Sequence, residues 1–149
     1  MMRNIHIGEM ELGWEDIEKF CKILIERIEE NFFPDVVIGV SRAGLIPALI
    51  VANHFDADFV PAIAKYICDY DGEVEVSLPD IKTLDNSKIL IVDDITVSGK
   101  TFFAVKDKIG GDSNVIKFAS LFCHPQFFIP DFYAQKTKVK LIFPWDKKL

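Results

Sequence analysis

Residues Ile89–Thr101 read ILIVDDITVSGKT, and this stretch is the most informative part of the chain. A run of apolar residues long enough for a buried strand ends at two adjacent carboxylates, Asp93 and Asp94. A short turn of hydroxyl and glycine residues follows, and then a pattern typical of a helix, FFAVKDKI. A turn between a strand and a helix places free backbone N–H groups and the positive end of the helix dipole at one point, which favours a phosphate group.

The two carboxylates before the turn favour a different ligand. Carboxylate oxygens bind ribose hydroxyls or a Mg²⁺ ion, whereas the turn binds an anion. A sugar phosphate bound together with magnesium satisfies both ends of the stretch. The sequence therefore predicts a ligand of this kind at the start of the helix.

The stretch resembles the signature with which type I phosphoribosyltransferases bind 5-phosphoribosyl 1-diphosphate (PRPP): an apolar strand, two acidic residues and a loop ending in Thr/Ser-Gly-x-Thr. A second segment, VVIGVSRAGLIPA at Val36–Ala48, is similar to the pyrophosphate loop of the purine salvage enzymes in this family. The C-terminal FPWD at Phe143–Asp146 resembles the segment after the purine site of the short xanthine–guanine and hypoxanthine enzymes. The resemblance extends from about Trp14 to Asp146.

Composition limits the classes of protein to which the chain can belong. With 149 residues, 50% of them hydrophobic and 27% charged, we expect one soluble domain over residues 1–149. The net charge of −6 argues against nucleic-acid binding through a basic surface. No apolar run approaches the roughly 18 residues of a membrane span, and the first residues lack the apolar core of a signal peptide. Three separated cysteines without a CxxC pair predict reduced thiols in a cytoplasmic protein.

Apolar periodicity predicts alternating helices and strands, and hence a single doubly wound α/β domain with a mainly parallel central sheet flanked by helices. Pro61 argues for an edge or early position of its strand. The predicted helices are Trp14–Ile28, Leu45–Phe55 and Lys100–Ile109, and the predicted strands are Val36–Val40, Phe59–Ile67, Glu73–Ser77, Lys88–Val92, Val115–Phe122 and Val139–Phe143.

Ligands of doubly wound domains bind at the carboxyl ends of the strands. Ser41, Asp93 and His124 each follow such an end, so three loops are expected to meet in one crevice. The polar segment Asp69–Asn86 falls where the family has a mobile hood loop. The resemblance implies that the residues around Tyr66–Val76 close over the site and exclude water.

The resemblance also assigns roles in binding PRPP. Asp93 and Asp94 would hold the ribose hydroxyls and Mg²⁺, directly or through water, and would orient the anomeric carbon. Gly99 would let the chain approach the ligand closely. The 5′-phosphate would be bound, mostly by backbone N–H groups, at Thr96, Val97, Ser98, Gly99, Lys100 and Thr101.

The pyrophosphate loop would consist of Ser41, Arg42, Ala43 and Gly44. Arg42 offers a permanently charged, bidentate donor that a diphosphate favours, and together with Asp93 and Asp94 it completes the catalytic set that the resemblance implies. The structural alternative is a tight turn whose serine caps the following helix, which is compatible with binding.

The base site departs from the purine pattern at three positions. His124 stands where a lysine commonly contacts the exocyclic oxygen of the purine, and Lys140 stands where an aromatic residue stacks on the base. Val97 replaces an aspartate that lies beside N7 in the 6-oxopurine enzymes, and valine cannot act as a general base. We expect the base to contact His124, Phe143 and Trp145.

The sequence thus predicts a phosphoribosyltransferase with Mg²⁺ as its cofactor. It would transfer the 5-phosphoribosyl group of PRPP to a nucleobase, in the first place a purine, releasing pyrophosphate and forming a nucleoside 5′-monophosphate. We expect a homodimer or a higher homo-oligomer. The alternative is a regulatory protein that binds PRPP or a nucleotide with little transferase activity, since the PRPP residues match the family and the base-site residues do not. A phosphate-binding protein unrelated to PRPP would make the acidic pair a coincidence.

Overall fold

The computed structural model of the protein describes residues 6–66, 73–79 and 84–149. The helices and strands in chain order are β1 (Glu9–Glu11), α1 (Trp14–Glu29), β2 (Val36–Val40), α2 (Leu45–Phe55), β3 (Asp58–Tyr66), β4 (Val74–Ser77), β5 (Lys88–Thr96), α3 (Lys100–Ile109), β6 (Val115–Cys123), β7 (Phe132–Lys136), β8 (Lys140–Ile142) and a 3-10 turn, η1 (Pro144–Asp146).

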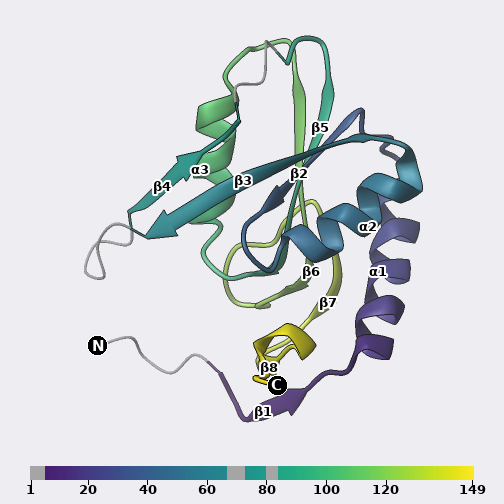
Figure 1. Ribbon diagram of the computed structural model, residues 1–149, viewed down its shortest axis with the longest axis vertical. Helices are drawn as coiled ribbons and strands as arrows, with labels where there is room; N and C mark the ends of the chain where they lie inside the picture. Colours follow the sequence, from purple (N-terminus) through teal and green to yellow (C-terminus); the bar gives the residue numbers. More distant parts are fainter. Residues whose placement is uncertain (1–5, 67–72, 80–83) are drawn as a thin grey trace.

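A six-stranded sheet in the order β4-β3-β2-β5-β6-β7 forms the centre of the molecule. Strands β3, β2, β5, β6 and β7 are parallel, and β4 pairs antiparallel with β3 at the edge. Helices α1 and α2 pack on one face of the sheet and α3 on the other (Figure 1). The predicted doubly wound, mainly parallel α/β fold is confirmed.

The central strand β5 carries the acidic pair. Residues Ile89 to Val92 are fully buried, because their side chains point alternately to the two faces of the sheet and helices cover both. The strand continues beyond Val92, its predicted end, because its pairing with β6 extends to Thr96 opposite Cys123. The acidic pair therefore lies inside the strand, and pairing with β6 fixes the backbone both before and after the pair.

A second sheet of two strands joins the ends of the described chain. Strand β1 pairs parallel with β8, with Met10 opposite Leu141. Strand β8 leads into η1, whose Trp145 and Asp146 line one cavity together with the loop after β2. The sequence predicted a last strand in this region, but it predicted neither β1 nor β7.

The edge of the main sheet agrees with two sequence predictions. Strand β4 lies within the predicted range Glu73–Ser77. Pro61 lies in the early part of β3, before the pairing with β4 begins at Ile63. The predicted hood loop falls partly on residues 67–72, which lie outside the described residues.

Two of the cysteines are free and buried, Cys21 and Cys123. Burial raises the pKa of the Cys21 thiol to about 11. Among the helices in the described parts of the chain, none is long and apolar enough to cross a membrane.

Candidate active site

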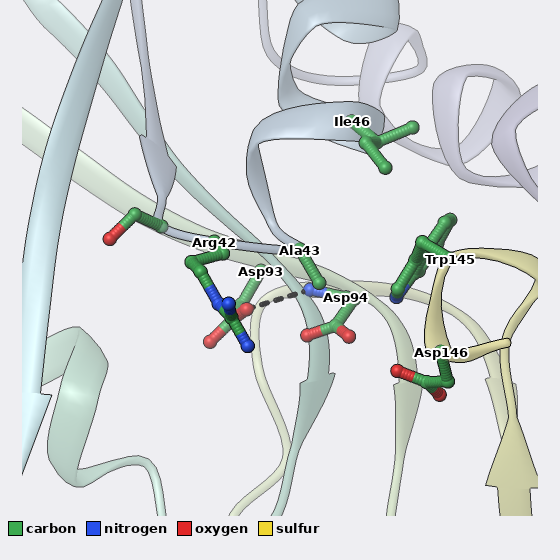
Figure 2. A pocket seen from close by; sticks show the side chains of 8 residues that line it. Arg42, Ala43, Ile46, Asp93, Asp94, Trp145 and Asp146 are labelled. Carbon is green, nitrogen blue, oxygen red and sulfur yellow. Dashed lines mark hydrogen bonds between the residues drawn. The ribbon is translucent and has the colours of Figure 1, made fainter. Parts of the chain in front are cut away.

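A cavity of about 490 Å³ lies where the carboxyl ends of β2 and β5 meet η1. Figure 2 shows side chains from the three segments around it. The combination of one guanidinium, three carboxylates and an indole ring suits a ligand that is charged at one end and aromatic at the other. The lining residues are Ser41, Arg42, Ala43, Ile46, Asp93, Asp94, Trp145 and Asp146.

The acidic pair is held by backbone hydrogen bonds. The Asp93 carboxylate accepts a hydrogen bond from the Asp94 N–H at 2.8 Å, and the Asp94 carboxylate accepts one from the Ile95 N–H at 2.9 Å (Figure 2 shows the first). Burial, followed by the charge of Asp94, raises the pKa of Asp93 well above its ordinary value. Burial also raises the pKa of Asp94, and the negative charge of the nearby Asp146 raises it further. Two such carboxylates favour a ligand that brings a cation or hydroxyl donors.

The loop from Ser41 to Gly44 packs directly against the acidic pair. A Cβ atom at Gly44 would lie 2.8 Å from Oδ1 of Asp93 and 3.0 Å from its Cα, so only glycine permits this approach. Gly44 is the N-cap of α2, and the Ser41–Arg42 peptide bond is cis. Ser41 does not cap the helix as in the structural alternative, because its hydroxyl accepts the Ala64 N–H at 3.4 Å.

The turn after β5 forms a second cavity, of about 220 Å³. The turn leads into α3, whose N-cap Gly99 has φ +79°, a conformation that favours glycine. The Ser98 hydroxyl accepts the Lys100 N–H at 3.4 Å. Thr96 Oγ1 is buried and has no hydrogen-bond partner among the described residues. All six residues predicted to bind a phosphate line this cavity, together with Tyr66, Asp93, Ile95 and Phe102.

The residues predicted to bind the base differ in their exposure. Trp145 lines the larger cavity. Phe143 is 4% exposed and stacks on Trp145, with 4.7 Å between the ring centroids and 9° between the planes. His124 is 1% exposed, and its Nδ1 accepts the Gln126 N–H at 3.2 Å. The structure thus brings Trp145 to the cavity, places Phe143 as its support, and places His124 within a turn.

Sequence reasoning assigned no ligand contact to five residues of the two cavities: Ile46, Tyr66, Ile95, Phe102 and Asp146. The Tyr66 hydroxyl lies 3.5 Å from Oγ1 of Thr101, across the smaller cavity. Asp146 was detectable as part of the FPWD segment, and Tyr66 as the last residue of a strand whose carboxyl end reaches the crevice.

The carboxylates fit a magnesium ion that arrives with its ligand. Within residues 6–66, 73–79 and 84–149, no group of three or more His, Cys, Asp or Glu residues is arranged to hold a metal ion. Protein sites for Mg²⁺ commonly supply one or two carboxylates and leave the other positions to water and substrate phosphates. Asp93 and Asp94 match that pattern.

Comparison with known proteins places this geometry in a family context. The crystal structure of a purine phosphoribosyltransferase from Pyrococcus horikoshii Ot3 is similar, with a TM-score of 0.83 and 30% sequence identity, covering 96% of this chain and 97% of that one. A xanthine-guanine phosphoribosyltransferase of Desulfotalea psychrophila is 26% identical over 141 residues, which is 91% of this chain and 84% of that protein. The fold also resembles the Helicobacter pylori xanthine-guanine-hypoxanthine phosphoribosyltransferase, with a TM-score of 0.80 and 20% identity, covering 93% of this chain and 94% of that one.

The family model for the phosphoribosyl transferase domain matches residues 13–146, a span that contains both cavities. The resemblance read from the PRPP stretch, the pyrophosphate loop and the FPWD segment is therefore confirmed. The chain belongs to the phosphoribosyltransferase family.

Proposed function

We propose that the two cavities together bind PRPP, with the ribose between them. The observation that carries this proposal is the position of Asp93, which lines both cavities. On one side of Asp93 lie the backbone amides of the turn before α3, and on the other lies Arg42 with its loop. PRPP has a 5′-phosphate on one side of its ribose and a diphosphate on the other, which matches this order of anion sites around a central carboxylate.

The proposed reaction is displacement of pyrophosphate from the anomeric carbon of PRPP by a ring nitrogen of a base. Asp93 and Asp94 would hold the ribose hydroxyls and orient this carbon for attack. Mg²⁺ would be held by the same two residues and would neutralise charge on the diphosphate. Arg42 and the amides of Ser41 to Gly44 would stabilise the charge that builds on the departing pyrophosphate.

We propose a purine as the acceptor base. The relatives with purine names support it, and so does the apolar surface that Trp145 and Ile46 give to the larger cavity. The Phe143 ring stacked behind Trp145 would fix the indole as a platform for a planar base. A direct contact of the base with His124 or Phe143 stays a prediction, as do the homo-oligomer and the cytoplasmic location.

A panel of nucleobases supplied with PRPP and Mg²⁺, with pyrophosphate release as the measurement, tests this function. We expect release with at least one purine and formation of its nucleoside monophosphate. PRPP binding by calorimetry without release for any base would favour the regulatory alternative.

The site assignment is tested separately by the double variant Asp93→Asn with Asp94→Asn. We expect it to lose Mg²⁺-dependent binding of PRPP while it remains folded by circular dichroism. Unchanged affinity for PRPP in this variant would contradict the assignment.

A further inference from the structure

The chain after β6 returns to the phosphate-binding turn. The pairing of β5 with β6 ends at Thr96 opposite Cys123, and the His124 N–H donates to the Thr96 carbonyl at 3.2 Å. A turn from His124 to Phe127 follows, closed by the Phe127 N–H on the His124 carbonyl at 3.2 Å. The next residue, Phe128, donates its N–H to the Val97 carbonyl at 3.0 Å. This turn therefore binds the backbone of the loop at two successive residues.

The ring of Phe128 covers the back of the same loop. A Cβ atom at Gly99 would lie 2.7 Å from Cγ and Cδ1 of Phe128, so the ring occupies the space where any other residue would place its side chain. Phe128 is itself held by three aromatic rings, with centroid distances of 6.4 Å to Phe102, 5.3 Å to Phe103 and 6.1 Å to Phe118. Phe102 and Phe118 belong to the core beneath α3, which makes the ring a rigid support.

We propose that Phe128 is a positioning residue that fixes the 5′-phosphate loop before the ligand binds. Its N–H fixes the Val97 carbonyl, and its ring prevents Gly99 from moving back from the cavity. The loop's N–H groups therefore keep their direction toward the phosphate without the ligand, which lowers the ordering cost of binding. This inference rests on the proposed function, because it takes residues 96–101 as the 5′-phosphate site.

The inference also gives His124 a structural role, which is separate from the predicted contact with the base. Its Nδ1 accepts the Gln126 N–H inside the turn, where Pro125 occupies the next position of the chain. Proline at the second position of a turn fixes the backbone angle that the turn needs. His124 and Pro125 thus shape the turn that delivers Phe128 to the loop.

The test compares ribose 5-phosphate with pyrophosphate as ligands, because only the first has a 5′-phosphate. Phe128→Ala should weaken binding of ribose 5-phosphate about tenfold by calorimetry, a loss expected for amides displaced by a fraction of an ångström. Pyrophosphate affinity should change less than twofold. Phe127→Ala is the matched control, since this neighbouring ring is 46% exposed, and it should leave both affinities unchanged. Phe128→Leu, which keeps more of the apolar contact than alanine does, should fall between, and it serves if the alanine variant does not fold.

Amide hydrogen exchange of the unliganded protein gives a readout independent of activity. Residues 97–101 should exchange at least several times faster in Phe128→Ala than in the wild type, and at the wild-type rate in Phe127→Ala. Gly99→Ala should also weaken ribose 5-phosphate binding, and its effect should be less than additive with Phe128→Ala, because the second change removes the ring that the new methyl group meets.

The outcomes separate the two proposals. If the wild type, Phe128→Ala and Phe128→Leu all bind ribose 5-phosphate equally tightly, the proposed role of Phe128 is overturned and the phosphate site stands. An equal loss for ribose 5-phosphate and pyrophosphate would overturn it as well, since that result indicates general destabilisation. Failure of the wild type to bind ribose 5-phosphate at all would overturn the phosphate site and this inference with it.

Discussion

At the scale of single residues, Arg42 brings a positive charge to a cavity in which we expect an anionic ligand to bind. It supplies a guanidinium to a cavity that also contains the carboxylates of Asp93, Asp94 and Asp146. A positive group among acids is costly to remove when the ligand is an anion, because the remaining carboxylates then repel it. The effect of removing Arg42 should therefore depend on how many phosphate groups the ligand places beside it.

We expect Arg42→Ala to weaken PRPP and pyrophosphate more than a nucleoside monophosphate, which has no diphosphate. Arg42 is exposed, so the loss of its charge-assisted contact corresponds to about 1.5–3 kcal/mol, or roughly 10- to 200-fold in affinity by calorimetry. Arg42→Lys keeps the charge but not the bidentate geometry and should recover part of the loss. Equal losses for all three ligands would show that Arg42 serves the fold instead.

Val97 decides a second prediction, about the identity of the base. Its backbone carbonyl is bound by Phe128, so a new side chain at this position leaves the loop's main contact in place. The wild type should turn over hypoxanthine, xanthine and guanine poorly, because valine offers no proton acceptor. Val97→Asp should raise turnover of at least one of them, since general base assistance is typically worth about 10²- to 10⁴-fold. Val97→Asn is the control, because asparagine has nearly the shape of aspartate but cannot act as a base. Efficient turnover of a 6-oxopurine by the wild type, with no gain in Val97→Asp, would contradict the prediction.

At the scale of elements, the sequence predicted those parts whose signal is local. The apolar run of β5 and the glycine at the start of α3 lie within one short stretch, and both were correctly placed. Strand β1 could not be predicted in this way, because its residues Glu9–Glu11 are all exposed and its stability comes from pairing with β8 at the other end of the chain. Phe128 was missed as a part of the phosphate site for the same reason, since tertiary contacts bring it to the loop.

The turn between β2 and α2 gives a prediction at this scale. Gly44 has φ −63°, which suits alanine, so the cost of Gly44→Ala comes from contact of the new methyl group with the Val40 carbonyl oxygen and with Asp93. Overpacking of this kind costs about 1–3 kcal/mol, and here it would displace the pyrophosphate loop from the acidic pair. We expect lower thermal stability together with weaker pyrophosphate binding. Gly13→Ala, where the nearest atom beyond the adjacent residues is 3.8 Å from the new Cβ, is the control, and equal effects of the two changes would argue against close packing at Gly44.

At the scale of the whole molecule, the site is a place where the fold is less stable than it could be. The chain has a net charge of −6, and it places Asp93 and Asp94 side by side inside the central sheet. Burial of charge opposes folding unless a partner compensates it. A ligand that brings Mg²⁺ and hydroxyl groups would supply this compensation, so binding and stability should be linked.

The final prediction follows from the pKa of Asp93, which burial and the neighbouring Asp94 raise well above the ordinary value of 3.8. A carboxyl group with a raised folded-state pKa contributes stability that is fully present below the unfolded pKa and is lost as the pH rises through the folded pKa. At neutral pH Asp93 therefore contributes less stability to the unliganded protein than it does at acidic pH. Asp93→Asn, which has the same shape without the charge, should raise Tm at pH 7 by at least a few degrees, since about 1 kcal/mol corresponds to roughly 2–4 °C for a chain of this size. The advantage should shrink as the pH is lowered toward the pKa of the carboxyl group in the unfolded chain. Glu18→Gln on the exposed face of α1 is the control and should have little effect. Thermal unfolding between acidic and neutral pH measures the difference, and a variant that is less stable than the wild type at pH 7 would contradict the assignment of Asp93 as a destabilising charge. With Mg²⁺ and PRPP added, the order should reverse, because the wild type gains more stability from the bound ligand than a variant that lacks one of the two carboxylates.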